Sequence, residues 1–75
     1  MAKAVKRLVI CVDNSGNEVS LERRKIYVSI PDGKAASLGL IRVIDESGED
    51  YLYPKKAFVE VALPQPIRRA VLHAA

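Results

Sequence analysis

The chain has 75 residues, which is enough for one small domain but not for two separate cores. Apolar residues make up 49% and charged residues 28% of the sequence, close to the averages of globular proteins, which excludes disordered and low-complexity chains. The single cysteine excludes an intramolecular disulfide and any zinc site built on a cysteine pair. We therefore expect one folded domain over residues 1–75, with no disulfide to stabilise it.

The basic start of the chain is followed by only five apolar residues, positions 8–12. This run is too short for the apolar core of a signal peptide and much too short for a membrane span, which needs about 20 residues. Cys11 lies within it and is expected to be a buried, unreactive thiol. We expect a cytoplasmic protein without a membrane segment.

Apolar residues recur at every second position in several segments, and turn-forming residues bound these segments. This pattern predicts strands along most of the chain. In the second of them Ile26, Val28 and Ile30 share one face and Tyr27 and Ser29 the other. A short helical turn is expected at 35–38, and a three-residue turn, Glu46-Ser47-Gly48, joins the third and fourth strands. The predicted strands are 6–12, 25–30, 40–44, 50–53 and 58–63.

After Pro64 and Pro66 the apolar spacing changes from two to four, which predicts a short helix over about 66–74. Ile67, Val71 and Leu72 give this helix an apolar side. A helix this short needs a surface to pack on, either on its own domain or on a second chain. These three residues are the candidate packing or oligomer face.

No arrangement of residues points to catalysis or to a bound group. His73 is the one histidine and is the third residue counted from the end of the chain, where a general base would lack a held geometry. The acidic hairpin at 45–50 does not have the ligand spacing of a calcium loop, and the glycines are scattered among separate turns instead of forming a phosphate-binding loop. The sequence predicts a protein that is not an enzyme and has no catalytic residues, metal site or cofactor.

Tyr51 and Tyr53 share a strand face, and the hairpin register decides what they meet. A three-residue loop pairs Tyr51 with Val43 and Tyr53 with Ile41, so both rings face apolar partners. A four-residue loop sets Tyr53 opposite Arg42 and creates an exposed stacking platform. Glycine at position 48 favours the three-residue loop.

The net charge is +3, and the basic residues gather before the second strand and after the fourth. If the two clusters lie on one surface, they could contact several phosphates. Ordinary lysines that protect strand edges from aggregation are an equally good explanation. The candidate binding surface comprises Arg23, Arg24, Lys25, Arg42, Tyr53, Lys55 and Lys56.

The run Arg42-Val-Ile-Asp-Glu-Ser-Gly-Glu-Asp-Tyr-Leu-Tyr-Pro54, together with Leu21, Lys25, Tyr27 and Phe58, resembles small uncharacterised bacterial proteins to which no activity is assigned. The pattern also resembles the Leu-x-x-Gly-Lys-x-Tyr segment of SH3-like domains, with Arg24 in place of the glycine. The resemblance implies a small SH3-like barrel and assigns no site residue. It agrees with the strands expected from periodicity.

The expected fold is therefore mainly β: a five-stranded, partly open SH3-like barrel over about 6–63, followed by the C-terminal helix. The expected function is a non-enzymatic interaction module that binds a protein partner or forms a homo-oligomer. The alternative is a weak, largely sequence-independent nucleic-acid-binding protein.

Overall fold

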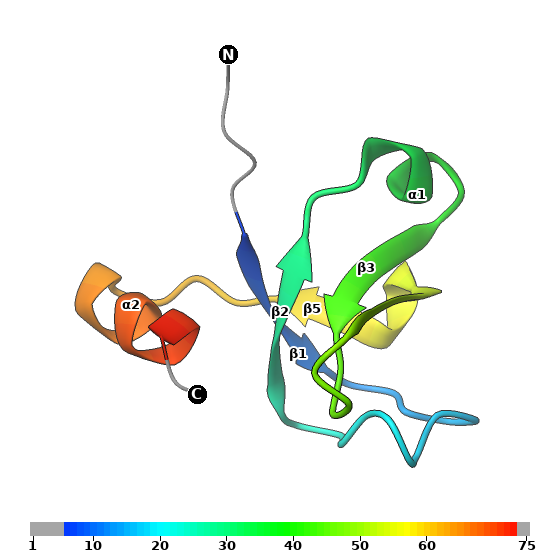
Figure 1. Ribbon diagram of the computed structural model, residues 1–75, viewed down its shortest axis with the longest axis horizontal. Helices are drawn as coiled ribbons and strands as arrows, with labels where there is room; N and C mark the ends of the chain where they lie inside the picture. Colours follow the sequence, from blue (N-terminus) through cyan, green and yellow to red (C-terminus); the bar gives the residue numbers. More distant parts are fainter. Residues whose placement is uncertain (1–5, 74–75) are drawn as a thin grey trace.

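The computed structural model describes residues 6–73 and shows a five-stranded antiparallel sheet that curls into a half-barrel (Figure 1). The strand order is β4-β3-β2-β1-β5, so the last strand returns to pair with the first. This confirms the predicted SH3-like, partly open barrel. The strands are β1 (Arg7–Cys11), β2 (Ile26–Ile30), β3 (Leu40–Ile44), β4 (Asp50–Pro54) and β5 (Phe58–Glu60).

Three short helices complete the fold: α1 (Gly33–Ser37), the 3-10 turn η1 (Lys55–Ala57) and α2 (Gln65–His73). The Asp32 carboxylate caps α1 by accepting a hydrogen bond of 3.0 Å from the Ala35 backbone N–H. The C-terminal helix is confirmed to residue 73. Position 74, its expected last residue, and residues 1–5 of the expected domain lie outside the described residues. Within residues 6–73 no helix has the length and apolar character needed to cross a membrane.

The fifth strand is shorter than the predicted 58–63. The Val61 N–H still donates to the Leu8 carbonyl at 2.9 Å, but regular pairing ends at Glu60. Pro64 comes four residues after Glu60 and Pro66 two residues later, and proline has no N–H to donate to a neighbouring strand. The chain therefore leaves the sheet early and begins α2.

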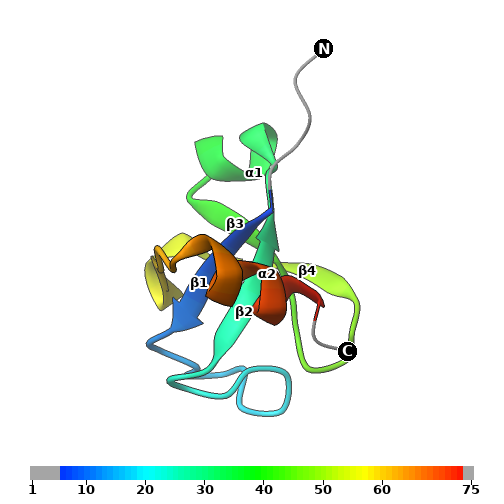
Figure 2. The same cartoon turned by 90° about the vertical axis from the view of Figure 1, so that its left-hand side faces the viewer.

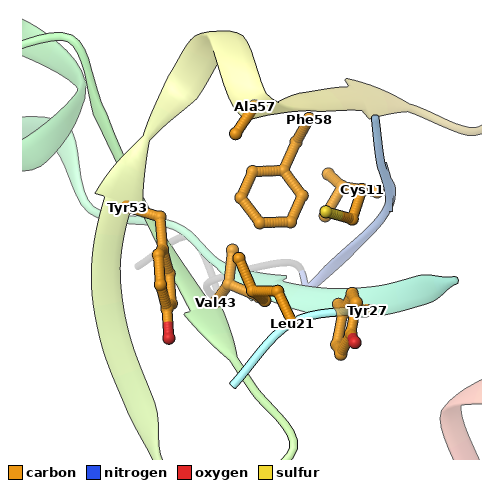
Figure 3. Packing of buried hydrophobic residues seen from close by; sticks show 8 residues of the cluster. Cys11, Leu21, Tyr27, Val43, Tyr53, Ala57 and Phe58 are labelled. Atoms are coloured by element: carbon orange, nitrogen blue, oxygen red, sulfur yellow. The ribbon is translucent and has the colours of Figure 1, made fainter. Parts of the chain in front are cut away.

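The core lies on the concave face of the sheet (Figure 3). The Phe58 ring stands edge-on to the rings of Tyr27 and Tyr53, with centroid distances of 6.5 Å and 6.2 Å, a favoured aromatic geometry. Leu21 enters from the long loop between β1 and β2 and is fully buried. The cluster consists of Val9, Cys11, Leu21, Tyr27, Val43, Tyr53, Ala57 and Phe58.

The better buried face of β2 carries Tyr27 and Ser29, while Ile26, Val28 and Ile30 lie on the other face and are only half-buried. The apolar triplet identified in the sequence is therefore not the core face of this strand. Period-two alternation separates the two faces of a strand but does not say which one meets the core when both carry apolar residues.

The helix α2 lies on the convex side of the sheet: Figure 1 shows it beside β1 and β2, and Figure 2 shows it in front of them. The Arg68 guanidinium donates a hydrogen bond to the Lys6 carbonyl and ties the helix to the start of β1. No residue of α2 is buried: Val71 and Leu72 are half-buried, and Ile67 is 53% exposed. The helix therefore rests on the sheet without becoming part of a core.

The β3–β4 hairpin has the predicted three-residue loop, with Tyr51 opposite Val43 and Tyr53 opposite Ile41. Gly48 takes φ +84°, the left-handed conformation that this turn requires. Tyr53 is 7% exposed and belongs to the core, whereas Tyr51 is 49% exposed. The register is confirmed, but it buries only one of the two rings.

Arg24, at the position where the SH3-like pattern has glycine, takes φ +73° and is the one non-glycine residue among 6–73 with positive φ. Its N–H donates to the Cys11 carbonyl at 2.7 Å and fixes this conformation at the start of β2. The left-handed region costs an L-residue roughly 1 kcal/mol or more. At this position an arginine therefore adopts a conformation that glycine reaches without steric cost.

We expect Arg24→Gly to stabilise the domain by about 0.5–1 kcal/mol, because glycine adopts positive φ without steric cost. The midpoint of urea unfolding should rise. Arg23→Gly is the matched control: Arg23 does not have positive φ, so the extra chain entropy of glycine should lower the midpoint. A lower midpoint for Arg24→Gly would show that the left-handed backbone carries no strain.

Candidate functional site

A network of hydroxyls and carboxylates lies at one rim of the half-barrel, where the long β1–β2 loop meets the β3–β4 turn. The Tyr53 hydroxyl donates to Asp45 Oδ2 at 2.6 Å, and its oxygen is also hydrogen-bonded to Ser20 Oγ at 2.9 Å. Ser47 donates its backbone N–H and its hydroxyl to Asp45 Oδ1. Burial alone raises the pKa of Asp45, but the bonds from Ser47 and Tyr53 outweigh it and lower the pKa. Asp45 is therefore an ionised carboxylate within the fold.

Glu46 forms the second half of this network. The Tyr27 hydroxyl donates to Glu46 Oε2 at 2.5 Å and accepts the Glu22 N–H at 2.7 Å. Lys25 Nζ lies 2.6 Å from the same Glu46 oxygen, and this bond, with that from Tyr27, lowers the pKa of Glu46. Burial, together with the Glu46 contact, raises the pKa of Tyr27. These contacts hold the β1–β2 loop against the β3–β4 turn, and they do so without a bound ligand.

Two of the predicted surface cations are already paired. Lys25 contacts Glu46 at 2.6 Å and Glu22 at 3.4 Å. Arg42 lies on β3 and bridges Asp32 at 3.0 Å and Asp50 at 2.8 Å. Neither cation is free to neutralise a phosphate without losing these partners.

Of the other predicted cations, Arg23 and Lys56 lie near one carboxylate and Lys55 lines a cavity. Hydrogen bonds from Ser15 lower the pKa of Asp13, and the charges of Lys56 and Arg23 lower it further, so these two side chains lie near the same carboxylate. Lys55 lines a cavity on the concave face of the sheet instead. Arg24 is exposed beside Arg23 at the start of β2. Arg23 of the first cluster and Lys56 of the second therefore lie near the same acidic residue.

Tyr53 was placed on the candidate binding surface, and the structure corrects this. Its ring packs against Phe58, and its hydroxyl is bound to Asp45 (Figure 3). The physical reason is the three-residue hairpin loop, which sets Tyr53 on the concave face instead of opposite Arg42. The ring is not available for stacking on a base.

The convex face is a feature that the sequence reading missed. Leu8 on β1 is 2% exposed, although it points away from the core cluster. Ile10, Val28 and Ile44 on the same side are half-buried. The signal was the unbroken apolar run at 8–12, since a strand whose two faces are both covered has no polar alternation.

The exposed part of this apolar surface lies at its margins. Leu52 on β4 and Val59 on β5 are 43% and 54% exposed, and Ile67 on α2 is exposed to a similar extent. Of the predicted packing face, Val71 and Leu72 are half-buried and Ile67 is more exposed. A helix places residues 68, 71 and 72 on one side and residue 67 at its edge. Ile67 is therefore the member of that face most open to a second molecule.

A cavity of about 240 Å³ opens on the concave face at the end of the sheet away from the tyrosine hydroxyls. Val9, Ile41 and Phe58 provide apolar lining, and Arg7, Ser29 and Lys55 provide polar groups. Within residues 6–73 there is no group of three His, Cys, Asp or Glu side chains placed to hold a metal. The molecule thus offers an apolar convex surface and a small amphipathic cavity.

Comparisons with protein-family models, with curated proteins and with solved structures find no match for this chain.

We expect Tyr53→Phe to lower the free energy of unfolding by about 1–3 kcal/mol, because it removes a donor from a buried carboxylate. Tyr51→Phe deletes the same atom from an exposed ring whose hydroxyl lies 3.3 Å from Glu49, and should change stability by less than about 0.5 kcal/mol. Urea unfolding of both variants checks this. Equal losses would show that the Asp45 bond does not stabilise the fold.

Stability should fall on acidification because the pKa values of Asp45 and Glu46 are lowered in the fold. Unfolded carboxyls titrate near pH 4, so this contribution is complete above about pH 5 and is lost as the pH falls through the lower folded values. The midpoint of urea unfolding from pH 7 to pH 2.5 measures it. An Asp45→Asn/Glu46→Gln double variant should show a flatter profile, and parallel profiles would contradict this origin.

Proposed function

We propose that this domain is a non-enzymatic interaction module that binds a protein partner or a second copy of itself through its convex face and α2. The observation that supports the proposal is the incomplete burial of α2. This amphipathic helix rests on an apolar sheet face, yet none of its residues is buried, and Ile67 is more than half exposed. Helices this short depend on packing for their stability, so a second surface over α2 would stabilise it.

The surroundings of this surface fit a protein partner better than a polyanion. The exposed residues at its margin, Leu52, Val59 and Ile67, are aliphatic. Exposed apolar residues of this kind, bordered by polar groups, are typical of protein contact sites. We further propose that the domain works in the cytoplasm, where the free thiol of Cys11 stays reduced, and that it is related to the small bacterial proteins that it resembles.

Nucleic-acid binding has less support from the geometry. Lys25 and Arg42 are held in ion pairs, and Tyr53 is buried. Arg23 and Lys56 lie close enough to act on one carboxylate, but that carboxylate, Asp13, offsets part of their charge. With two of the six cations paired and two more sharing a carboxylate, Arg24 and Lys55 alone supply little of the phosphate affinity that such binding requires.

Ile67→Asp should abolish self-association and leave the urea midpoint nearly unchanged, because the wild-type side chain is exposed in the single chain. Val71→Asp should lower the free energy of unfolding by about 1–2 kcal/mol, and the urea midpoint with it, because Val71 is half-buried against its own domain. Sedimentation velocity over a range of concentrations, with urea unfolding, measures both effects. The two variants thus separate the contact of α2 with a second molecule from its packing on its own domain.

Arg69→Asp is the control, since residue 69 is exposed and lies on the side of α2 away from Val71. It should change neither the sedimentation coefficient nor the midpoint appreciably. A wild-type chain that stays monomeric at every concentration excludes a second copy and leaves a different protein as the partner. If Ile67→Asp and Val71→Asp change neither folding nor oligomeric state, the packing role of this face is wrong.

A further inference from the structure

The lining of the concave cavity contains no residue of α2. The apolar lining includes Val9 on β1, Ile41 on β3 and Phe58 on β5. Val9 and Phe58 belong to the core cluster, so this part of the wall is rigidly packed from behind. A volume of about 240 Å³ has room for one leucine- or phenylalanine-sized group and is too small for a nucleotide.

Both carboxylates that line the cavity are already engaged. Glu60 pairs with Arg7 across β1 and β5 at 3.2 Å. Asp32 accepts hydrogen bonds from the Ala35 N–H and from Arg42 Nε, each at 3.0 Å, and these two bonds lower its pKa. The cavity thus has no unpaired acidic group that would attract a cation.

Lys55 is the remaining charged group in the lining. It comes from η1, and its backbone N–H is fixed by a bond of 3.0 Å to the Gly39 carbonyl. None of the ion pairs within residues 6–73 involves the Lys55 side chain. Arg7 is paired with Glu60, and Arg42 with Asp32 and Asp50, so Lys55 is the cation of the lining that no carboxylate contact within residues 6–73 occupies, and it stands beside an apolar wall.

We propose that this cavity binds an apolar group that carries one carboxylate, with the apolar part against Ile41 and Phe58 and the carboxylate on Lys55. A single cation outside the ion pairs matches a monoanion, and the ion pairs of Arg7 and Arg42 stay intact. The Ser29 hydroxyl also lines the cavity and adds a polar contact for the ligand. This chemistry is shared by the C-terminal residue of a peptide and by a free branched or aromatic carboxylic acid.

Amide chemical shifts of labelled protein, titrated with N-acetyl-L-leucine, test the proposal. Shift changes should concentrate at the cavity residues Val9, Ile41 and Phe58, with a dissociation constant on the order of 1 mM for a ligand of this size. N-acetyl-L-leucinamide has the same side chain without the charge and should bind about tenfold more weakly. Equal binding of acid and amide would overturn the assignment of the carboxylate to Lys55.

Two variants locate the site. Lys55→Gln should weaken binding of the acid about tenfold, while Lys56→Gln, the exposed neighbour outside the cavity, should not change it. Ala36→Phe places a ring at an exposed position of α1 that lines the cavity and should abolish binding without unfolding the domain. Equal losses from Lys55→Gln and Lys56→Gln, or binding that survives Ala36→Phe, would show that the ligand lies elsewhere.

Two further ligands show whether the bound carboxylate belongs to the C-terminus of a peptide or to a free carboxylic acid. A pentapeptide ending in leucine that binds at least tenfold more tightly than 4-methylpentanoate, and loses that gain when its C-terminus is amidated, identifies a protein C-terminus. Equal affinities identify a free carboxylic acid. Binding of neither ligand, in protein whose amide spectrum shows it folded, overturns the proposal and leaves the role of the convex face untouched.

Discussion

The whole barrel depends on two neighbouring carboxylates in one tight turn. Asp45 and Glu46 bind the hydroxyls of Tyr53 and Tyr27, the two tyrosines of the core. The Glu46 N–H also donates to the Ser20 carbonyl at 3.0 Å, so the turn holds the irregular loop that follows β1. That loop delivers Leu21 to the core. Polar bonds at the rim therefore position an apolar residue that no strand supplies.

The curvature of the sheet divides its concave face into a closed end and an open end. At the closed end the rim network seals the aromatic cluster. At the open end β5 has only three residues, and the chain turns away before the sheet can close. The cavity beside Lys55 is what remains between β5 and α1. Its existence follows from early strand termination rather than from a dedicated binding loop.

Features set by residues close together in the chain were predictable from the sequence, whereas contacts between distant segments were not. The Gly48 turn fixed the hairpin register, and the register placed Tyr53 inside, since both follow from residues close in the chain. Glu46, which pairs with Lys25, and Asp32, which pairs with Arg42, come from other segments of the chain, so only the structure shows these two ion pairs. The cavity was equally hidden, because it depends on where β5 ends.

Cys11 sits at the centre of these arrangements and is fully enclosed, and burial raises the pKa of its thiol. A buried, protonated thiol does not react with alkylating reagents until the structure around it opens. Its neighbours include Phe58 on β5, opposite it in the sheet, and the loop whose Arg24 N–H binds its carbonyl. The sequence therefore contains a single thiol that reports on opening of the core. The rate at which an alkylating reagent labels Cys11 measures how often the barrel and the loop separate.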